Sequence, residues 1–124
     1  MRVFGYFYYT VVQMAIKQSL LGPHEQLILL AIMHIGQDAY GMTIRREVEA
    51  RSSRKLSIGA VYTTLERLQR KGYVRSRIGE ATMERGGRAK RHYEITAEGE
   101  LALKESHDLL RSMAEGLKFR LEAK

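Results

Sequence analysis

The segment SIGAVYTTLERLQRKGYVRSR, residues 57–77, constrains the fold more than any other part of the chain. Ser57 suits a helix N-cap, and Gly72 suits the position just after a helix ends. Four apolar residues between them recur at helical spacing and predict one buried stripe: Ile58, Val61, Leu65 and Leu68. The opposite face is small toward its start and basic toward its end: Gly59, Ala60, Thr63, Arg67 and Arg70. One side of this helix is therefore expected in a core, and the other is expected to approach a second surface closely.

The other elements follow from apolar spacing and turn residues. They are a central helix that begins at Pro23 and ends at residues 36–38, a helix over 41–51, strands over 73–78 and 91–96 joined through Gly86-Gly87, and a helix from Ala97 to about Leu121. This order is typical of a winged helix-turn-helix, in which the third helix enters DNA. We therefore expect a mainly α fold with a small β-hairpin wing and a long C-terminal helix, assembled as a homodimer.

The outer face of residues 57–70 has the properties that DNA binding requires. Small residues would let the start of this helix enter the major groove, which is about 12 Å wide. The hydroxyls of Ser57 and Thr63 can bond phosphates or base edges. Arg67 or Arg70 can reach a guanine or a phosphate, and the sequence leaves open which. The hairpin cations suit the DNA backbone or the minor groove, or simply keep a hairpin in solution: Arg88, Lys90 and Arg91.

The charge of the chain is concentrated in its middle. The formal net charge is +7, but residues 41–93 carry 14 Lys/Arg against 5 Asp/Glu, whereas the rest carries 7 against 9. The middle is thus +9 and the remainder −2, which indicates either a polyanionic partner such as double-stranded DNA or a basic solvated surface. The chain has no cysteine, so disulfides are excluded and a cytoplasmic location is compatible.

The last predicted helix is too long for a small core to cover. About 25 residues span roughly 37 Å. Its apolar positions, three of them in heptad spacing, predict a dimerisation seam: Leu103, Leu110, Met113, Leu117 and Leu121. The alternative is a helix that folds back wholly on its own domain.

Four segments between about Leu20 and Leu117 resemble the PadR family of bacterial winged-helix transcriptional regulators: LLGPHEQLILLAIM, AYGMTIRREVE, LSIGAVYTTLERLQRKGYVRS and ERGGRAKRHYEITAEGELAL. Their common order and spacing make the resemblance specific. It implies a homodimer, held by N- and C-terminal helices, that presents one recognition helix per subunit to a palindromic operator. It also implies that Tyr40 and Tyr62 contact phosphates. The remaining DNA-facing positions that it implies are Ser57, Gly59, Ala60, Thr63, Arg67, Arg88, Lys90 and Arg91.

The resemblance also implies a mode of regulation. Members are mostly repressors, and some are released by phenolic acids or flat aromatic drugs bound at the dimer interface. A small hydrophobic or aromatic effector is therefore expected. This chain departs from the drug-binding pattern because it lacks tryptophan, on which some relatives stack their ligands. His107, Met113 and Phe119 could line another site, or they could pack in a core or interface.

The start of the chain does not fit this pattern. Residues 1–13, MRVFGYFYYTVVQ, are rich in aromatic residues. They are interpreted as a docked extra helix or strand, as an artefact upstream of a true start at Met14, or as a weak membrane-surface anchor. A membrane span is not expected, because polar residues interrupt the apolar run. The expected organisation is an N-terminal extension (1–19), a winged helix-turn-helix domain (20–96) and a dimerisation helix (97–124).

Other functional classes have little support in the sequence. Common catalytic motifs and phosphate-binding glycine loops are absent, so neither an enzyme nor a cofactor is expected. His24 and His34 are interpreted as structural. His107-Asp108 is the one candidate metal pair on the last helix, and no metal site is expected. The main rival is a winged helix that serves as a protein–protein adaptor, although an adaptor does not require a basic recognition face.

Overall fold

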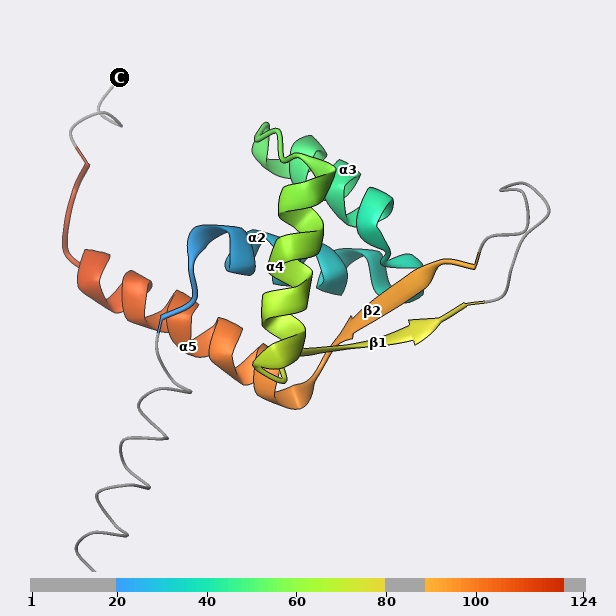
Figure 1. Ribbon diagram of the computed structural model, residues 1–124. Helices are drawn as coiled ribbons and strands as arrows, with labels where there is room; N and C mark the ends of the chain where they lie inside the picture. Colours follow the sequence, from blue (N-terminus) through green and yellow to red (C-terminus); the bar gives the residue numbers. More distant parts are fainter. Residues whose placement is uncertain (1–19, 80–88, 120–124) are drawn as a thin grey trace, which may run out of the picture.

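A computed structural model describes residues 20–79 and 89–119 of the chain. The elements run in the order α2 (Pro23–Ile35), a 3-10 turn η1 (Gly36–Asp38), α3 (Gly41–Ser52), α4 (Ile58–Arg70), β1 (Val74–Ile78), β2 (Arg91–Ile95) and α5 (Ala97–Ala114). In Figure 1, α4 crosses in front of α2, the hairpin projects to one side and α5 runs to the other. The predicted mainly α fold with a two-stranded hairpin is confirmed, and most boundaries agree within one or two residues.

The hairpin is antiparallel and is tied to the turn between α2 and α3. Its pairing runs from Val74 opposite Ile95 to Ile78 opposite Arg91. The Tyr93 backbone N–H donates to the Ala39 carbonyl at 2.8 Å. Val74 and Tyr93 are buried against the helices, so one face of the hairpin belongs to the core. The predicted Gly86-Gly87 turn and Arg88 lie outside the described residues.

The last helix is shorter than the sequence pattern predicted. It ends at Ala114, not near Leu121, and Gly116 follows with φ of +82°. Glycine adopts this left-handed conformation without steric cost, so it stops a helix readily. Leu117 therefore lies beyond the helix, and Leu121 lies outside the described residues. The prediction of a helix that continues to about Leu121 was wrong for this reason, whereas the dimer seam stays a prediction.

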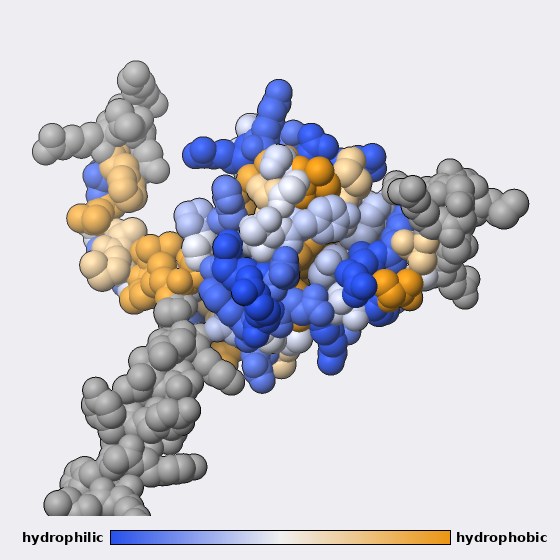
Figure 2. Space-filling model, viewed as in Figure 1, coloured by the Kyte–Doolittle hydropathy of each residue, from blue (hydrophilic) through white to orange (hydrophobic). Residues whose placement is uncertain are grey.

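Leu103 also differs from its predicted position in a dimer seam. It is buried within its own domain, together with Ala102 and Ser106 from the first half of α5. The second half of the helix extends past the domain, and apolar side chains gather over this end of the surface, at the left of Figure 2. The half-buried or exposed apolar residues there are Leu109, Leu110, Met113, Leu117 and Phe119.

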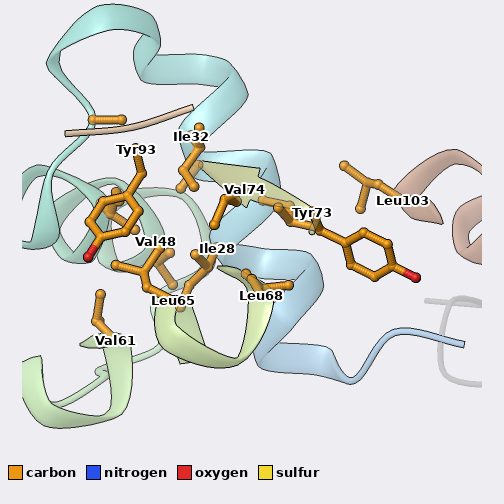
Figure 3. Close-up of a cluster of buried hydrophobic side chains, with 14 of the residues drawn as sticks. Ile28, Ile32, Val48, Val61, Leu65, Leu68, Tyr73, Val74, Tyr93 and Leu103 are labelled. Atoms are coloured by element: carbon orange, nitrogen blue, oxygen red, sulfur yellow. The ribbon is translucent and has the colours of Figure 1, made fainter. Parts of the chain in front are cut away.

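One core joins the three-helix unit, the hairpin and the start of α5 (Figure 3). Its largest fully buried side chains come from α2, α3 and α4: Ile28, Leu29, Ile44, Val61, Leu65 and Leu68. Burying each such side chain contributes roughly 1.5–3 kcal/mol. Because α4 supplies three of these six residues, its orientation is fixed by the core.

Two predictions about burial need correction. Ile58 was placed in the buried stripe of α4, but it is 36% exposed because it is the first residue of the helix and lies at the edge of the core. The helix α2 was predicted to be central in the fold. Instead, Leu30 and Met33 are 44% and 46% exposed, so one face of α2 is uncovered in the described chain. None of the described helices is long and apolar enough to cross a bilayer.

A pair of helical glycines tests the packing of α5 against the hairpin. A Cβ at Gly99 would collide with the Tyr73 carbonyl, whereas a Cβ at Gly59 would find its nearest neighbour, Ser57 Oγ, only at 4.0 Å. We expect Gly99→Ala to destabilise the fold by about 1–3 kcal/mol through overpacking. Gly59→Ala should be neutral or stabilising by up to about 1 kcal/mol, since alanine favours helix. Thermal denaturation of the two variants checks this, and equal melting temperatures would contradict it.

Candidate nucleic-acid interface

The outer face of α4 is open and lined by small residues at its start. The Ser57 hydroxyl accepts a hydrogen bond from the Ala60 N–H at 3.0 Å, which confirms Ser57 as the N-cap. Gly59 and Thr63 are exposed on the side opposite the buried residues. No internal contact requires a glycine at position 59, since a Cβ there would have Ser57 Oγ, 4.0 Å away, as its nearest neighbour. This part of α4 therefore has room for an external surface to come close to the backbone.

The second half of this face is polar and charged. Arg70 is exposed two turns after Thr63, with no ion pair among the described residues. Glu66 is also exposed, between Thr63 and Arg70 on the helix surface, so the face is not purely basic. Figure 2 shows hydrophilic side chains gathered over the second half of α4 and toward the base of the hairpin. The outer face thus changes from small to charged along its length, as the sequence pattern indicated.

Tyr62 lies over the N-terminus of α3. A Cβ on Gly41 would collide with the Tyr62 hydroxyl and ring, so only glycine allows this close approach. Tyr62 itself remains 48% exposed. Tyr40 is the N-cap residue of α3 and lies directly before Gly41. The structure therefore brings the two tyrosines to the same end of α3, where the helix dipole favours an anion.

The base of the hairpin joins this cluster. Tyr40 forms an isolated β-bridge with His92, and the two rings meet edge to face with centroids 5.7 Å apart. The Lys90 ammonium lies 4.3 Å from the centroid of the Tyr40 ring, which is a cation–π distance. His92 Nδ1 is 3.0 Å from the Gln37 carbonyl oxygen. The hairpin is thus fixed to the start of α3, with Lys90 beside Tyr40.

The hairpin arginines differ in how they are held. Arg91 donates through a terminal nitrogen to the Ser76 hydroxyl across the two strands, at 3.0 Å. Arg75 pairs with Glu94 on the exposed face. Arg77 reaches the Gln37 carbonyl at 3.5 Å. Of the three predicted wing cations, Lys90 and Arg91 are therefore ordered beside α3 and β1, and Arg88 is outside the described residues.

Arg67 is not on the outermost face of α4, where the sequence pattern had placed it. It turns toward α2, and its Nε lies 3.4 Å from Glu25 Oε2. Lys71 Nζ donates to the same carboxylate oxygen at 2.8 Å. Glu25 Oε1 accepts from the Gly22 N–H at 2.8 Å, so Glu25 also caps α2. Glu25 is not among the site residues predicted from the sequence. A carboxylate in the first turn of an apolar helix was the available signal.

The environment of Glu25 favours its charged form. Burial raises the pKa of this carboxyl, but the hydrogen bonds from Lys71 and Gly22 and the charges of Lys71 and Arg67 outweigh that effect. The net result is a pKa below the ordinary value. A buried ionised carboxylate is tolerated only with such partners. The Glu25 cluster, defined here as Glu25, Arg67 and Lys71, is therefore an ion-pair network that joins α2 to α4.

A groove of about 590 Å³ lies where α2, the α3–α4 connection and α5 meet. Leu27, Leu30 and Leu110 contribute apolar surface, whereas Arg54 and Lys55 contribute positive charge. In the described part of the chain, no group of three or more His, Cys, Asp or Glu side chains is placed to hold a metal ion. His107 Nδ1 lies 3.7 Å from Asp108 Oδ1 on the exposed side of α5.

A model of the family described as "Transcriptional regulator PadR-like family" matches residues 29–105. The chain belongs to this family. The match covers α2 from Leu29, both later helices of the three-helix unit, the hairpin and the first half of α5. These proteins are DNA-binding regulators, so the expectation that the chain is not an enzyme is confirmed. No curated protein matches the chain.

Solved structures show the same fold. A PadR family transcription regulator from Clostridium difficile is 26% identical, with a TM-score of 0.62 over 76% of this chain and 93% of that one. A PadR family regulator from Eggerthella lenta is 18% identical, with a TM-score of 0.61 over the whole of both chains. F93 from STIV, described as a winged-helix DNA-binding protein, is 19% identical, with a TM-score of 0.59 over 75% and 92%. The PadR-like chain therefore has a winged-helix fold.

The lowered pKa of Glu25 predicts a pH-dependent contribution to stability. A carboxyl with a depressed pKa stabilises the fold fully above its ordinary value of 4.5, and this contribution is lost as the pH falls through the lower folded-state pKa. We expect Glu25→Gln to cost about 1–3 kcal/mol at neutral pH, the size of a lost buried hydrogen bond to a charged group. The difference from the wild type should shrink at about pH 3. Denaturant unfolding at both pH values measures it, and a constant difference would exclude the ion-pair network as its cause.

Proposed function

We propose that this PadR-like regulator is a cytoplasmic, dimeric repressor that binds a palindromic DNA operator. The observation that carries the proposal is the division of α4 into a fully buried side and an open side that starts with glycine and ends with arginine. A helix face that only meets solvent does not need small, uncovered residues at its start. A helix that enters a DNA groove does need them, because they let its backbone come close to the groove. The family membership supports a DNA partner.

The proposed interface has three parts. The outer face of α4 would enter the major groove, the N-terminus of α3 would meet a phosphate, and the hairpin would follow the neighbouring backbone or minor groove. The residues proposed to contact DNA are Tyr40, Ser57, Gly59, Ala60, Tyr62, Thr63, Arg67, Arg70, Arg88, Lys90 and Arg91. Their roles differ: Thr63 and Arg70 point away from the core and suit base edges, whereas Tyr62 and Lys90 flank the start of α3 and suit phosphates.

We propose that the overhanging half of α5 forms the dimer interface. Leu110 and Met113 follow Leu103 by seven and ten residues, so they continue the same helix face beyond the point where the core covers it. An exposed apolar stripe of this kind marks an interaction surface. Residues 97–124 would act as the dimerisation segment, residues 20–96 as the DNA-binding domain, and residues 1–19 as an extension.

We also propose that a small effector releases the regulator from its DNA operator. The groove between α2, the α3–α4 connection and α5 supports it, because its lining combines apolar side chains with Arg54 and Lys55. A small aromatic or hydrophobic anion has matching chemistry. Leu110 lines this groove and also belongs to the proposed dimer interface, so an occupant would contact both the interface and the segment that leads into α4.

The proposed DNA contacts are tested by enriching a duplex from a random pool with the wild-type protein and measuring its affinity by fluorescence anisotropy. Binding should weaken steeply with salt, by about 0.9 in log K per log[salt] for each phosphate contact. Thr63→Ala and Arg70→Ala should each weaken binding to the enriched duplex by about 1–3 kcal/mol. Lys104→Ala removes a cation on the exposed side of α5 and should leave the affinity nearly unchanged.

Two outcomes would count against this proposal. If no duplex is enriched and no salt-dependent binding occurs, DNA is not the partner and the adaptor function takes its place. If Arg70→Ala and Lys104→Ala weaken binding equally, charge alone determines affinity and the outer face of α4 is not the interface.

The dimer proposal is tested by two leucines on opposite sides of α5. Leu110 and Leu101 are similarly exposed, at 51% and 54%, but only Leu110 lies on the face that continues the buried stripe. Leu110→Glu should convert the dimer to a monomer, because a charge in an apolar seam loses its hydration. Leu101→Glu should leave the dimer intact. Analytical ultracentrifugation measures both, and a dimeric Leu110→Glu variant would place the interface elsewhere.

A further inference from the structure

Glu25, on α2, holds Arg67 of α4 and Lys71, the C-cap residue of α4. Its side chain is 6% exposed, whereas those of Arg67 and Lys71 are 45% and 40% exposed. The carboxylate is thus the buried anchor of the Glu25 cluster, and the cations extend from it toward solvent. Its second oxygen is bonded to the Gly22 N–H, which fixes the carboxylate in the first turn of α2. The Glu25 carboxylate is therefore held by a hydrogen bond at each of its two oxygens.

Arg67 is the cation that can serve two partners at once. Its contact to Glu25 uses Nε. The guanidinium has four further N–H donors on its two terminal nitrogens, in a planar fork that matches a phosphate. Lys71 makes the shorter contact to the carboxylate, at 2.8 Å against 3.4 Å, and so supplies the closer neutralising charge. One anion with two cations leaves this cluster with a net positive charge.

The position of Arg67 brings it beside the proposed DNA face. Arg67 follows Thr63 by four residues, which places it about 40° further round the helix. It therefore flanks the outer face on the side nearest the N-terminus of α2. A long, flexible arginine loses much side-chain freedom when it binds a phosphate. An arginine that is already held by a buried carboxylate has lost part of that freedom before DNA arrives.

From these contacts we propose that Glu25 is a positioning residue for DNA binding, which acts by holding the Nε edge of Arg67 so that the terminal nitrogens are presented to a backbone phosphate. This proposal rests on the proposed function, and it adds a residue that does not itself touch DNA. Glu25 carries a negative charge close to the surface proposed to bind DNA. Electrostatic repulsion alone therefore predicts that removing this charge strengthens DNA binding. The positioning role predicts the opposite for the specific complex.

The test compares Glu25→Gln with Glu100→Gln on the enriched duplex and on a scrambled one. Both variants add one unit of positive charge, but Glu100 is exposed at the start of α5 and belongs to no ion pair among the described residues. For Glu25→Gln we expect operator affinity to fall roughly tenfold, the lower end of the effect of one charge-assisted contact, with scrambled-duplex affinity unchanged or higher. Glu100→Gln should weaken neither complex. A loss of folded protein would lower both affinities together, so this split separates positioning from stability.

A second variant leaves the buried Glu25 unchanged and alters the exposed Arg67 instead. Arg67→Lys retains the charge on an exposed side chain, but an ammonium cannot hold Glu25 and a phosphate through separate edges of one plane. Operator affinity should fall while scrambled-duplex affinity is kept. In the double variant Glu25→Gln/Arg67→Lys, the operator affinity should match that of Arg67→Lys alone, because Glu25 acts through Arg67.

Three results would overturn the proposal. They are an unchanged or higher operator affinity for Glu25→Gln, an equal loss on both duplexes for Arg67→Lys, or full additivity in the double variant. Each of these can occur while the wild type still prefers its operator, in which case only the role of Glu25 fails. A wild type without any duplex preference would instead remove the proposed function, and the role of Glu25 with it.

Discussion

The burial of one side of α4 is the contact on which the rest of the structure depends. Val61, Leu65 and Leu68 are inaccessible to solvent and lie among side chains from α2 and α3 (Figure 3). A close-packed core tolerates little rotation of such a helix, because each side chain fills space that no other residue fills. The orientation of Thr63 and Arg70 on the opposite side is therefore set from within the protein. A helix that reads DNA needs this property, since a backbone whose orientation is already fixed loses little entropy on binding.

The hairpin and α5 depend on the same core in different ways. The hairpin places Val74 and Tyr93 in it and is also bonded to Ala39, so the wing base is fixed against the start of α3. Only the first half of α5 reaches the core, where Gly99 allows a close contact with the Tyr73 carbonyl. The second half keeps the apolar pattern, and residues 20–79 and 89–119 leave Leu110 and Met113 exposed there. In a chain of this size, a second subunit is the simplest way to bury that stripe.

Much of the fold could be predicted from the sequence because its signals are local. Ser57, Gly72 and Thr96 mark helix or turn boundaries through their own backbone and hydroxyl chemistry, and each is found at the predicted boundary. The end of α5 was missed because leucine spacing was followed past Gly116, although a glycine is a stronger local signal than a single leucine. The burial of Leu103 could not be predicted, since heptad spacing alone does not say which surface covers an apolar face.

The candidate site was harder to predict than the fold, because a count of charged residues in the sequence does not show which of them are paired in the structure. The +9 of the middle segment indicates a polyanion, but several of its cations have anionic partners in the fold: Arg51 with Glu47, Arg75 with Glu94, and Arg67 and Lys71 with Glu25. Glu25 lies outside the middle segment, so a count over that segment cannot include it. An exposed pair can exchange its partner for a phosphate at little cost, as ion pairs at the surface contribute at most about 1 kcal/mol. The contact between Arg67 and Glu25 differs, because this carboxylate is buried and, among the described residues, losing Arg67 would leave it with Lys71 as its one cation. Under the proposed function, an Arg67 that keeps its contact to Glu25 would be restricted in the geometry with which its terminal nitrogens meet a phosphate.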